Sequence, residues 1–200
     1  MKLLVATTNP DKLKEIVSVL GDIPLAIRVL SDFPDVEIAE EAGLTFAENA
    51  RAKARHYARA TGLLTMAEDS GFEVDALDRE PGIHSARYLR PDATYPERFE
   101  AIYQAVRARP SGNNAARFVC ALALASGGDI LFESEGIVVG ALAAQPAGDG
   151  GFGYDPIFYY PAYGKTFGEL SPKEKAAVSH RGLAMRALGA YLSSTSPSRR

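Results

Sequence analysis

The stretch Leu63-Leu64-Thr65-Met66-Ala67-Glu68-Asp69-Ser70-Gly71 decides the fold class that we predict for this chain. Its first five residues are typical of a buried strand, and two carboxylates follow directly before Ser-Gly breaks the strand. A central strand of an α/β sheet delivers acidic side chains in this way to a crevice at its carboxyl end. Asp69 at that end is a candidate metal ligand or proton acceptor, and the alternative is a plain polar turn after a strand.

Strands and helices alternate on both sides of this stretch, as in an α/β fold. Periodicity and capping residues predict helices that begin near Pro10, Phe46, Tyr95 and Pro172. We expect strands at residues 2–6, 26–30, 63–67, 72–77, 116–125, 130–139 and 157–160. The short connection Ser126-Gly127-Gly128-Asp129 predicts a β-hairpin. The predicted fold is therefore α/β, a mixed twisted sheet with flanking helices in one domain over residues 1–192, followed by a disordered tail over residues 193–200.

The composition argues against several classes of protein. A net charge of -3 and an isoelectric point near 5.7 provide no electrostatic footprint for a nucleic-acid backbone. Cys120 is the single cysteine and lies in an apolar run, so we expect no disulfide and a reducing compartment. No apolar run has the length of a signal peptide or a membrane span. We therefore expect a soluble, cytoplasmic protein that binds neither nucleic acid nor membrane.

The turn after the first predicted strand has the features of an anion site. Asn9 is placed to cap the following helix, Pro10 takes its first position, and Asp11 lies in its first turn. Free backbone N–H groups and the helix dipole both point at this turn, where the Thr7 and Thr8 hydroxyls and Lys12 add contacts to a phosphate. The alternative is a well-capped strand–helix unit with no ligand. Neither a Walker loop nor a GxGxxG motif is present, which argues against a standard NTPase or dinucleotide site.

An acidic loop precedes the predicted helix at residues 46–61. Glu40 and Glu41 lie in this loop, and the capping box Thr45-Phe46-Ala47-Glu48 opens the helix. Asn49 and Lys53 are four residues apart and share one face near the helix start. A right-handed strand–helix–strand connection places this loop beside Asp69. The alternative is that the acids serve only the helix dipole.

The last third of the chain carries two further candidate stretches. Gly148-Asp149-Gly150-Gly151-Phe152-Gly153-Tyr154-Asp155-Pro156 allows close backbone approach to a ligand, and Phe152 or Tyr154 offers a face for a planar ring. The final predicted helix carries a polar interruption made of Lys175, Ser179, His180 and Arg181. The alternatives are a flexible loop for the first stretch and a solvated helix face for the second.

Six motifs occur in this order: Thr7-x-Asn9-x-x-Lys12, Glu40-Glu41-x-Gly43-Leu44-Thr45-Phe46-x-Glu48-Asn49-Ala50, Asp69-Ser70-Gly71, Pro81-Gly82-Ile83-x-Ser85-Ala86-Arg87-Tyr88, Gly151-Phe152-Gly153-Tyr154-Asp155-Pro156 and Ser179-His180-Arg181. Together they resemble the Ham1/RdgB family of inosine/xanthosine triphosphate pyrophosphatases, over roughly residues 3 to 190. The resemblance implies Mg²⁺-dependent hydrolysis of non-standard purine nucleoside triphosphates (ITP, dITP, XTP) to the monophosphate and pyrophosphate. It also implies a homodimer and a two-lobed, Maf/Ham1-like fold with the active-site cleft between the lobes.

The resemblance also implies roles for individual residues. Asp69 would accept the proton of the attacking water and hold Mg²⁺ with Glu40, for which Glu41 is the next candidate, while Lys53 takes part in catalysis and Ser70 contacts the substrate. A carboxylate that binds Mg²⁺ is a poor base, so the alternative role of Asp69 is to position a metal-polarised water. The triphosphate would lie on Thr7, Thr8, Asn9, Pro10, Asp11 and Lys12. The nucleoside would lie on Phe152, Gly153, Tyr154, Asp155, Lys175, His180 and Arg181.

This chain departs from the family pattern at three positions. Two functions other than the one that the family implies are also considered. Thr8, Ala42 and Phe72 stand where glycine, threonine and leucine are usual, and none of these changes removes a charged group. A non-catalytic nucleotide sensor would need no acidic residues for a metal, and Glu40 and Asp69 argue against it. A phosphatase with Asp69 as nucleophile would carry a second acid two residues later, where this chain has Gly71.

Overall fold

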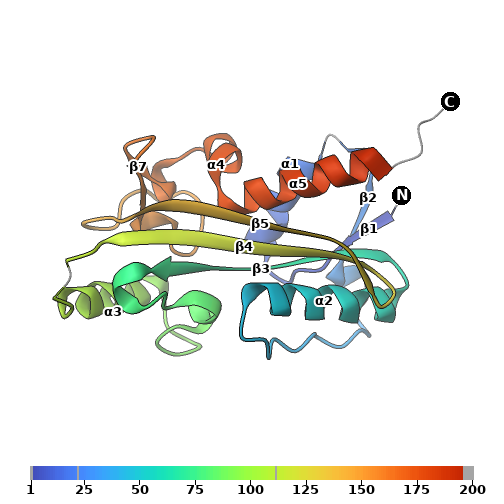
Figure 1. The fold of residues 1–200 in the computed structure, drawn as a ribbon, viewed down its shortest axis with the longest axis horizontal. Coiled ribbons are helices and arrows are strands. Elements are labelled where there is room, and N and C mark those ends of the chain that lie inside the picture. The colour runs from blue at the N-terminus through green and yellow to red at the C-terminus, as the bar shows by residue number, and fades with distance from the viewer. Residues whose placement is uncertain (1, 22, 111, 196–200) are drawn as a thin grey trace. The chain divides into compact units, whose positions relative to one another are not determined.

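The computed structural model describes residues 2–21, 23–110 and 112–195, and its strands form one mixed sheet (Figure 1). The sheet has seven strands in the order β2-β1-β3-β4-β5-β6-β7. The strands are β1 (Lys2–Val5), β2 (Ala26–Val29), β3 (Leu64–Val74), β4 (Ala115–Ser126), β5 (Asp129–Leu142), β6 (Phe158–Tyr160) and β7 (Lys165–Thr166). The helices are α1 (Pro10–Leu20), α2 (Phe46–Thr61), α3 (Tyr95–Arg107), α4 (Pro172–Val178) and α5 (His180–Thr195).

Strand directions confirm the prediction of a mixed α/β sheet. β1 pairs in parallel with both β2 and β3, whereas β6 pairs antiparallel with β5 and with β7. Only Gly127 and Gly128 separate β4 from β5, so these neighbouring strands form the predicted hairpin.

Two of the helices begin where their capping residues predict. Asn9 Oδ1 accepts hydrogen bonds from the backbone N–H groups of Asp11 and Lys12 at 2.9 and 3.2 Å, which fixes the start of α1. Thr45 accepts from the Glu48 N–H at 3.1 Å and starts α2, whose bounds match the predicted helix at residues 46–61. The apolar face of α2 is buried as its spacing predicts, and it comprises Phe46, Ala50, Ala54, Tyr57 and Ala58.

The strand that carries Asp69 is longer than we predicted. We expected a break at Ser70-Gly71 and a second strand afterwards, but β3 runs without interruption from Leu64 to Val74. Asp69 therefore lies in mid-strand. Its partner β1 is shorter and pairs only as far as Met66, because the chain leaves the sheet at Thr7. Glu68 and Asp69 thus lie beyond the carboxyl end of β1, which is the crevice position that the sequence pattern indicates.

The final helix is also different from the prediction, because it is two helices. α4 ends at Val178 and α5 begins at His180, and Ser179 between them has extended backbone angles (φ -70°, ψ 155°). Lys175 therefore lies on one helix, and His180 and Arg181 lie on the next. α5 continues to Thr195 and includes the first three residues of the predicted tail, while residues 196–200 lie outside the described residues.

The chain divides into two compact units, each with its own core. Unit 1 comprises Met1–Asp69, Cys120–Gly136 and His180–Arg200, and unit 2 comprises Ser70–Val119 and Ile137–Ser179. In unit 1, α2 covers one face of the sheet and α1 with α5 covers the other (Figure 1). Its core includes Leu3, Ile16, Met66, Cys120 and Leu188, so the single thiol is buried as expected.

The core of unit 2 is dominated by aromatic side chains. Phe72, Phe99, Phe118, Tyr154, Phe158 and Phe167 belong to it, together with aliphatic residues from β3, α3, β4 and β5. Among residues 2–21, 23–110 and 112–195, the helices are all too short or too polar to cross a membrane.

Candidate functional site

Asp69 lies on the α2 side of β3 and is held there by two side chains of α2. Its carboxylate accepts a hydrogen bond from Asn49 Nδ2 at 2.9 Å and lies 3.5 Å from Lys53 Nζ. Asp69 is only 7% exposed. Burial raises the pKa of Asp69 above its ordinary value, although Lys53 and the Asn49 amide act in the opposite direction. A raised pKa makes the carboxylate a better proton acceptor.

Asn49 is itself fixed by a close approach of backbone in the acidic loop. The N–H of Gly43 donates to Asn49 Oδ1 at 2.8 Å, which leaves the amide Nδ2 to point at Asp69. A Cβ atom at position 43 would lie 2.7 Å from that same Oδ1, so a side chain there would displace the amide. The glycine of the Glu-Glu-x-Gly motif is thus needed for the orientation of Asp69.

Lys53 connects Asp69 to the acidic loop. Its ammonium lies 2.7 Å from Glu41 Oε1 and 3.5 Å from Asp69 Oδ1, so the two carboxylates are neighbours around one cation. Burial alone would lower the pKa of Lys53, but Asp69, Glu68 and Glu41 outweigh it and raise this pKa. Glu40, which we predicted as a metal ligand, is exposed.

Glu68 lies on the opposite side of β3 from Asp69, because side chains alternate along a strand. It is 3% exposed, and its Oε1 atom lies 2.8 Å from Lys12 Nζ and 3.6 Å from Arg181 Nη2. The Cys120 thiol donates to Glu68 Oε2 at 3.4 Å. Burial would raise the pKa of Glu68, but Lys12 and Arg181 outweigh it and hold this pKa well below its ordinary range. Glu68 therefore stays ionised and fixes Lys12.

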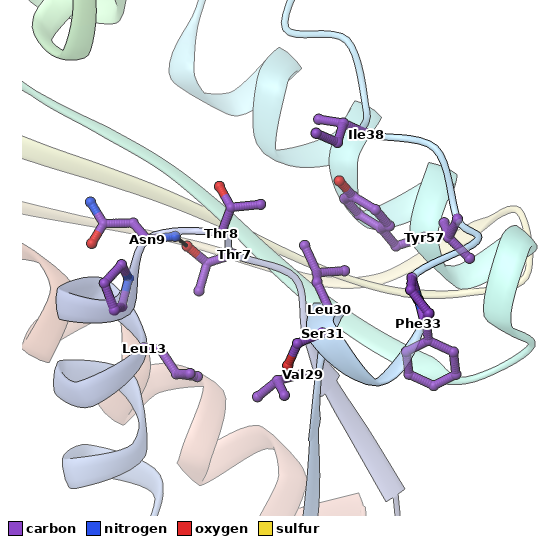
Figure 2. Close-up of a pocket in the computed structure, with 13 residues that line it drawn as sticks. Thr7, Thr8, Asn9, Leu13, Val29, Leu30, Ser31, Phe33, Ile38 and Tyr57 are labelled. Carbon is purple, nitrogen blue, oxygen red and sulfur yellow. Dashed lines mark hydrogen bonds between the residues drawn. The ribbon is translucent and has the colours of Figure 1, made fainter.

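The predicted phosphate turn lines a pocket of about 400 Å³ within unit 1. Thr7, Thr8 and Asn9 form one side of this pocket, and Phe33, Ile38 and Tyr57 lie on the other (Figure 2). α1 begins beside this pocket, with Pro10 as the first residue of the helix and Asp11 in the first turn. This turn combines hydroxyl groups, a helix N-terminus and Lys12, as an anion site requires.

A second group of predicted residues lies within unit 2. Lys175 Nζ donates to Asp155 Oδ2 and lies 4.6 Å from the centre of the Phe152 ring. The backbone N–H of Phe152 donates to the same Asp155 oxygen at 2.7 Å. Gly151 has φ +67°, and a Cβ there would lie 2.0 Å from Asp155 Oδ2, so only glycine fits. We call Phe152, Asp155 and Lys175 the ring cluster.

Tyr154 and Arg181 each have partners within their own units. Tyr154 is 3% exposed and packs in the core of unit 2, with its hydroxyl donating to the backbone carbonyl of Ser85 at 2.8 Å. Arg181 belongs to unit 1 and pairs with Glu15 at 2.5 Å and with Glu68. Both residues were predicted to contact the nucleoside, as was the buried His180 of unit 1.

Sequence reasoning overlooked the roles of three residues. Glu68 was noticed only as the neighbour of Asp69, and Asn49 only as the neighbour of Lys53 on one helix face. The signal for Glu68 was strand alternation, which predicts that adjacent acids in a buried strand face opposite layers. Glu15 was not noticed, because an acid on an exposed helix position carries no signal until its partner Arg181 is known.

The carboxylates near Lys53 have the chemistry of a hard-cation site. Within the described residues, no group of three or more His, Cys, Asp and Glu side chains is arranged to hold a metal ion. Asp69 and Glu41 nevertheless share one cation, the Lys53 ammonium, and carboxylate oxygens are the ligands that Mg²⁺ prefers. The donor set therefore fits Mg²⁺.

The chain is similar in sequence and in structure to known proteins over nearly its whole length. A dITP/XTP pyrophosphatase of Yersinia pseudotuberculosis is 46% identical over 189 residues, which are 92% of this chain and 94% of that protein. The dITP/XTP pyrophosphatase of Escherichia coli K12 is 43% identical over 189 residues, 94% of this chain and 95% of that protein. A solved HAM1 protein structure from Coxiella burnetii superposes with a TM-score of 0.91 at 38% identity, covering 98% of this chain and all of that one.

The match to the family itself extends over nearly all of the sequence. The model of the Ham1 family matches residues 3–191, which include all six motifs. The resemblance stated from those motifs is therefore confirmed, and the chain belongs to the Ham1 family.

Proposed function

We propose that this protein hydrolyses non-standard purine nucleoside triphosphates (ITP, dITP and XTP) to the nucleoside monophosphate and pyrophosphate. The names of the curated relatives, dITP/XTP pyrophosphatases, support this activity. The observation that carries the proposal is the arrangement around Asp69: a buried carboxylate of raised pKa next to Lys53, in the unit that also holds the Thr7–Lys12 turn.

The phosphate turn, the two lysines and Asp69 of unit 1 each have a chemical task in this proposal, and Ser70 of unit 2 has one as well. The triphosphate lies at the turn formed by Thr7, Thr8 and Asn9, and Asp69 accepts the proton of the attacking water, with Ser70 next to it as a substrate contact. Attack at the α-phosphorus breaks its bond to the oxygen that leads to the β-phosphate. Lys12 and Lys53 stabilise the negative charge that passes to the departing pyrophosphate.

A bound Mg²⁺ completes this proposal. Asp69 and Glu41 are the ligands that the geometry supports, and exposed Glu40 remains the ligand that the sequence analysis put first. The ion neutralises phosphate oxygens and orients water. The Lys53 ammonium contacts both carboxylates and balances part of their charge.

The ring cluster is the proposed contact for the nucleoside, together with Gly153. Phe152 is partly exposed and offers a face for stacking on a purine, whereas Lys175 supplies a donor beside it. A purine with a 6-oxo group presents an acceptor to such a donor, and adenine presents an amino donor instead. A buried donor without a partner costs about 1–3 kcal/mol, so two mismatched contacts give about a hundredfold preference against ATP.

The competing functions make different products, and product analysis separates them. We expect purified protein with ITP and Mg²⁺ to release pyrophosphate and IMP in equal amounts. Release of orthophosphate would favour the phosphatase with Asp69 as nucleophile, and binding without turnover would favour a nucleotide sensor. Either outcome would overturn the proposal.

The lysines provide a test of the phosphate site. Replacing Lys12 or Lys53 with Ala should lower ITP turnover by about a hundredfold, because each supplies charge to the phosphates. Arg51→Ala, on the same helix as Lys53 and half exposed, is the control and should keep its activity. Activity per folded molecule that stays at the wild-type level in both lysine variants would exclude them from the site.

Arg181 provides a test of the assignment at the base. If Arg181 contacts the 6-oxo group, Arg181→Ala narrows the ratio of kcat/KM values for ITP and ATP by about tenfold. If it serves only Glu68 and Glu15, the variant loses activity for both nucleotides equally and the ratio stays constant. Steady-state kinetics with both nucleotides decides, and a constant ratio would remove Arg181 from base recognition.

The family resemblance also has implications for the oligomeric state and the location of the protein. We propose a cytoplasmic homodimer, as the family resemblance implies. Sedimentation of the purified chain should give twice the mass of 21.4 kDa, and a monomeric mass at assay concentration would contradict it.

A further inference from the structure

Phe72, Ser85 and Tyr154 form a closed triangle of contacts within unit 2. The backbone N–H of Phe72 donates to the Ser85 hydroxyl at 2.9 Å. The Tyr154 hydroxyl donates to the Ser85 carbonyl at 2.8 Å. The rings of Phe72 and Tyr154 stack with centroids 5.2 Å apart and an angle of 16° between their planes, which closes the triangle.

Two corners of the triangle belong to the sequence motifs, and the third directly follows one of them. Phe72 directly follows Asp69-Ser70-Gly71, Ser85 lies in the motif at residues 81–88, and Tyr154 lies in the glycine-rich segment. No catalytic or binding task has been assigned to the motif at residues 81–88. Ser85 also donates to the Gly82 carbonyl at 2.6 Å, which ties the hydroxyl to its own short helix.

The Tyr154 corner lies in the chain segment that carries the ring cluster. Phe152 and Asp155 flank Tyr154 in sequence, and Asp155 binds both Lys175 and the Phe152 N–H. Gly151 and Gly153 have positive φ angles, so this segment depends on glycine conformations rather than on regular structure. Its position is therefore set by the anchors on either side of those glycines.

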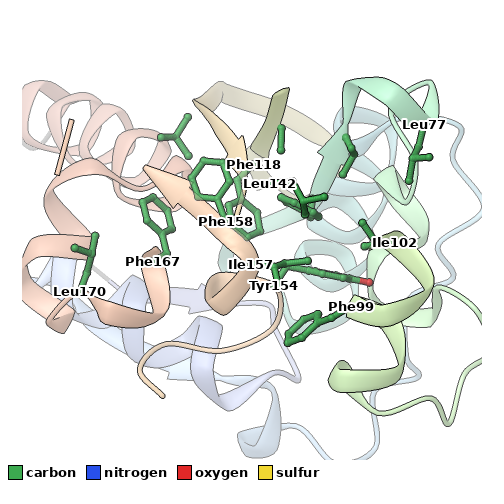
Figure 3. Packing of buried hydrophobic residues seen from close by; sticks show 14 residues of the cluster. Leu77, Phe99, Ile102, Phe118, Leu142, Tyr154, Ile157, Phe158, Phe167 and Leu170 are labelled. Carbon is green, nitrogen blue, oxygen red and sulfur yellow. The ribbon is translucent and has the colours of Figure 1, made fainter. Parts of the chain in front are cut away.

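Tyr154 is the aromatic anchor of this segment. Its ring lies beside Phe99, with Ile157 close by (Figure 3). Centroid distances from the Tyr154 ring are 5.4 Å to Tyr95 and 6.1 Å to Phe99. A ring that is 3% exposed and stacked on Phe72 has no face for a nucleobase, so its task differs from that of Phe152.

We propose that the triangle of Phe72, Ser85 and Tyr154 positions the ring cluster for the substrate base, so that these three are positioning residues and not substrate contacts. The proposal rests on the proposed function of the ring cluster. It assigns a task to the motif at residues 81–88, which is to hold the glycine-rich segment against the strand that carries Asp69.

The first test removes the ring stack. Phe72→Ala removes the ring and with it the stack on Tyr154, and we expect the KM for ITP to rise about tenfold while kcat changes by less than about threefold. The matched control is Phe167→Ala, because Phe167 is equally buried in the same core and its ring contacts are with Phe118, Phe158 and Tyr160. The control should lower the melting temperature similarly and leave KM within about twofold.

The second test removes a hydrogen bond and keeps the ring. Tyr154→Phe retains the stack on Phe72 but loses the bond to the Ser85 carbonyl, so it should raise KM less than Phe72→Ala does. In the double variant the two effects on KM should combine to less than their product, because both act on one triangle of contacts. If Phe72→Ala fails to fold, Tyr154→Phe alone still tests the proposal, which predicts a raised KM.

Different results of these measurements would contradict the role of the triangle and the proposed base site. If wild-type protein prefers ITP to ATP and Phe72→Ala changes KM no more than Phe167→Ala does, the triangle has only a structural role and the proposal is wrong. Independent effects of the two substitutions on KM would also contradict it. If Phe152→Ala and Lys175→Ala leave the KM for ITP unchanged, the ring cluster does not bind the base and the proposed function loses its base site.

Discussion

Asp69→Asn is expected to fold normally and to lower ITP turnover by at least about a hundredfold, the usual scale for loss of a general base or a metal ligand. The amide keeps the size of the side chain and its contact with α2, but it accepts no proton and binds a hard cation poorly. Steady-state turnover at saturating Mg²⁺ is the measurement. Thermal melting of the same sample shows whether the variant is folded.

Glu73→Gln is the matched control for this variant. Glu73 lies four residues later in β3, is also buried, and pairs with Arg117 at 2.5 Å. Its loss should affect stability but leave turnover per folded molecule unchanged. Turnover of Asp69→Asn that approaches the wild-type value, or that equals that of Glu73→Gln, would show that Asp69 is not catalytic.

Glu68→Gln is expected to have the largest effect on stability, about 3 kcal/mol or more in the free energy of unfolding at neutral pH. The substitution removes the buried negative charge next to Arg181, whose side chain is 2% exposed, and it also releases Lys12. Urea unfolding of variant and wild type measures the difference. Turnover should fall as well, because Lys12 loses its fixed position.

The pH dependence of this difference has a definite sign. The pKa of Glu68 is lower in the folded protein than its ordinary value of 4.5, so its stabilising effect is complete above that value. The effect is lost as the pH falls below 4.5 towards the folded-state pKa, and the two proteins should converge in stability there. A difference that grows in acid would contradict the assignment.

Glu15→Gln tests whether the stabilising effect of Glu68 depends on its burial or only on its charge pairing with Arg181. Glu15 contacts the same guanidinium, but its side chain is 22% exposed, so solvent screens the pair. Its loss should cost no more than about 1 kcal/mol. Equal losses in the free energy of unfolding for Glu15→Gln and Glu68→Gln would mean that the burial of Glu68 does not increase its stabilising effect.

Local sequence signals predicted those parts of the fold that depend on local physics. Asn9 and Thr45 define the starts of α1 and α2 because a capping side chain acts within three residues of its own position. The predicted burial of the apolar face of α2 was correct because helical spacing alone sets which residues share a face. The hairpin of β4 and β5 followed from its short glycine connection.

The errors occurred where distant contacts decide the local structure. Ser70 and Gly71 are typical turn residues, yet β3 continues through them, because Ser85, thirteen residues further along, hydrogen-bonds the next residue, Phe72. Ser179 breaks the final helix although the sequence around it is helical in character. In the candidate site, Glu68 gained its importance from Arg181, which is more than a hundred residues away in sequence.

The central claim is that this protein selects purines with a 6-oxo group over adenine. Parallel measurement of kcat/KM for ITP, dITP, XTP and ATP with Mg²⁺ tests this claim most directly. The account predicts that ITP, dITP and XTP each exceed ATP by about a hundredfold or more, with pyrophosphate as the product. Similar kcat/KM values for ITP and ATP would contradict it.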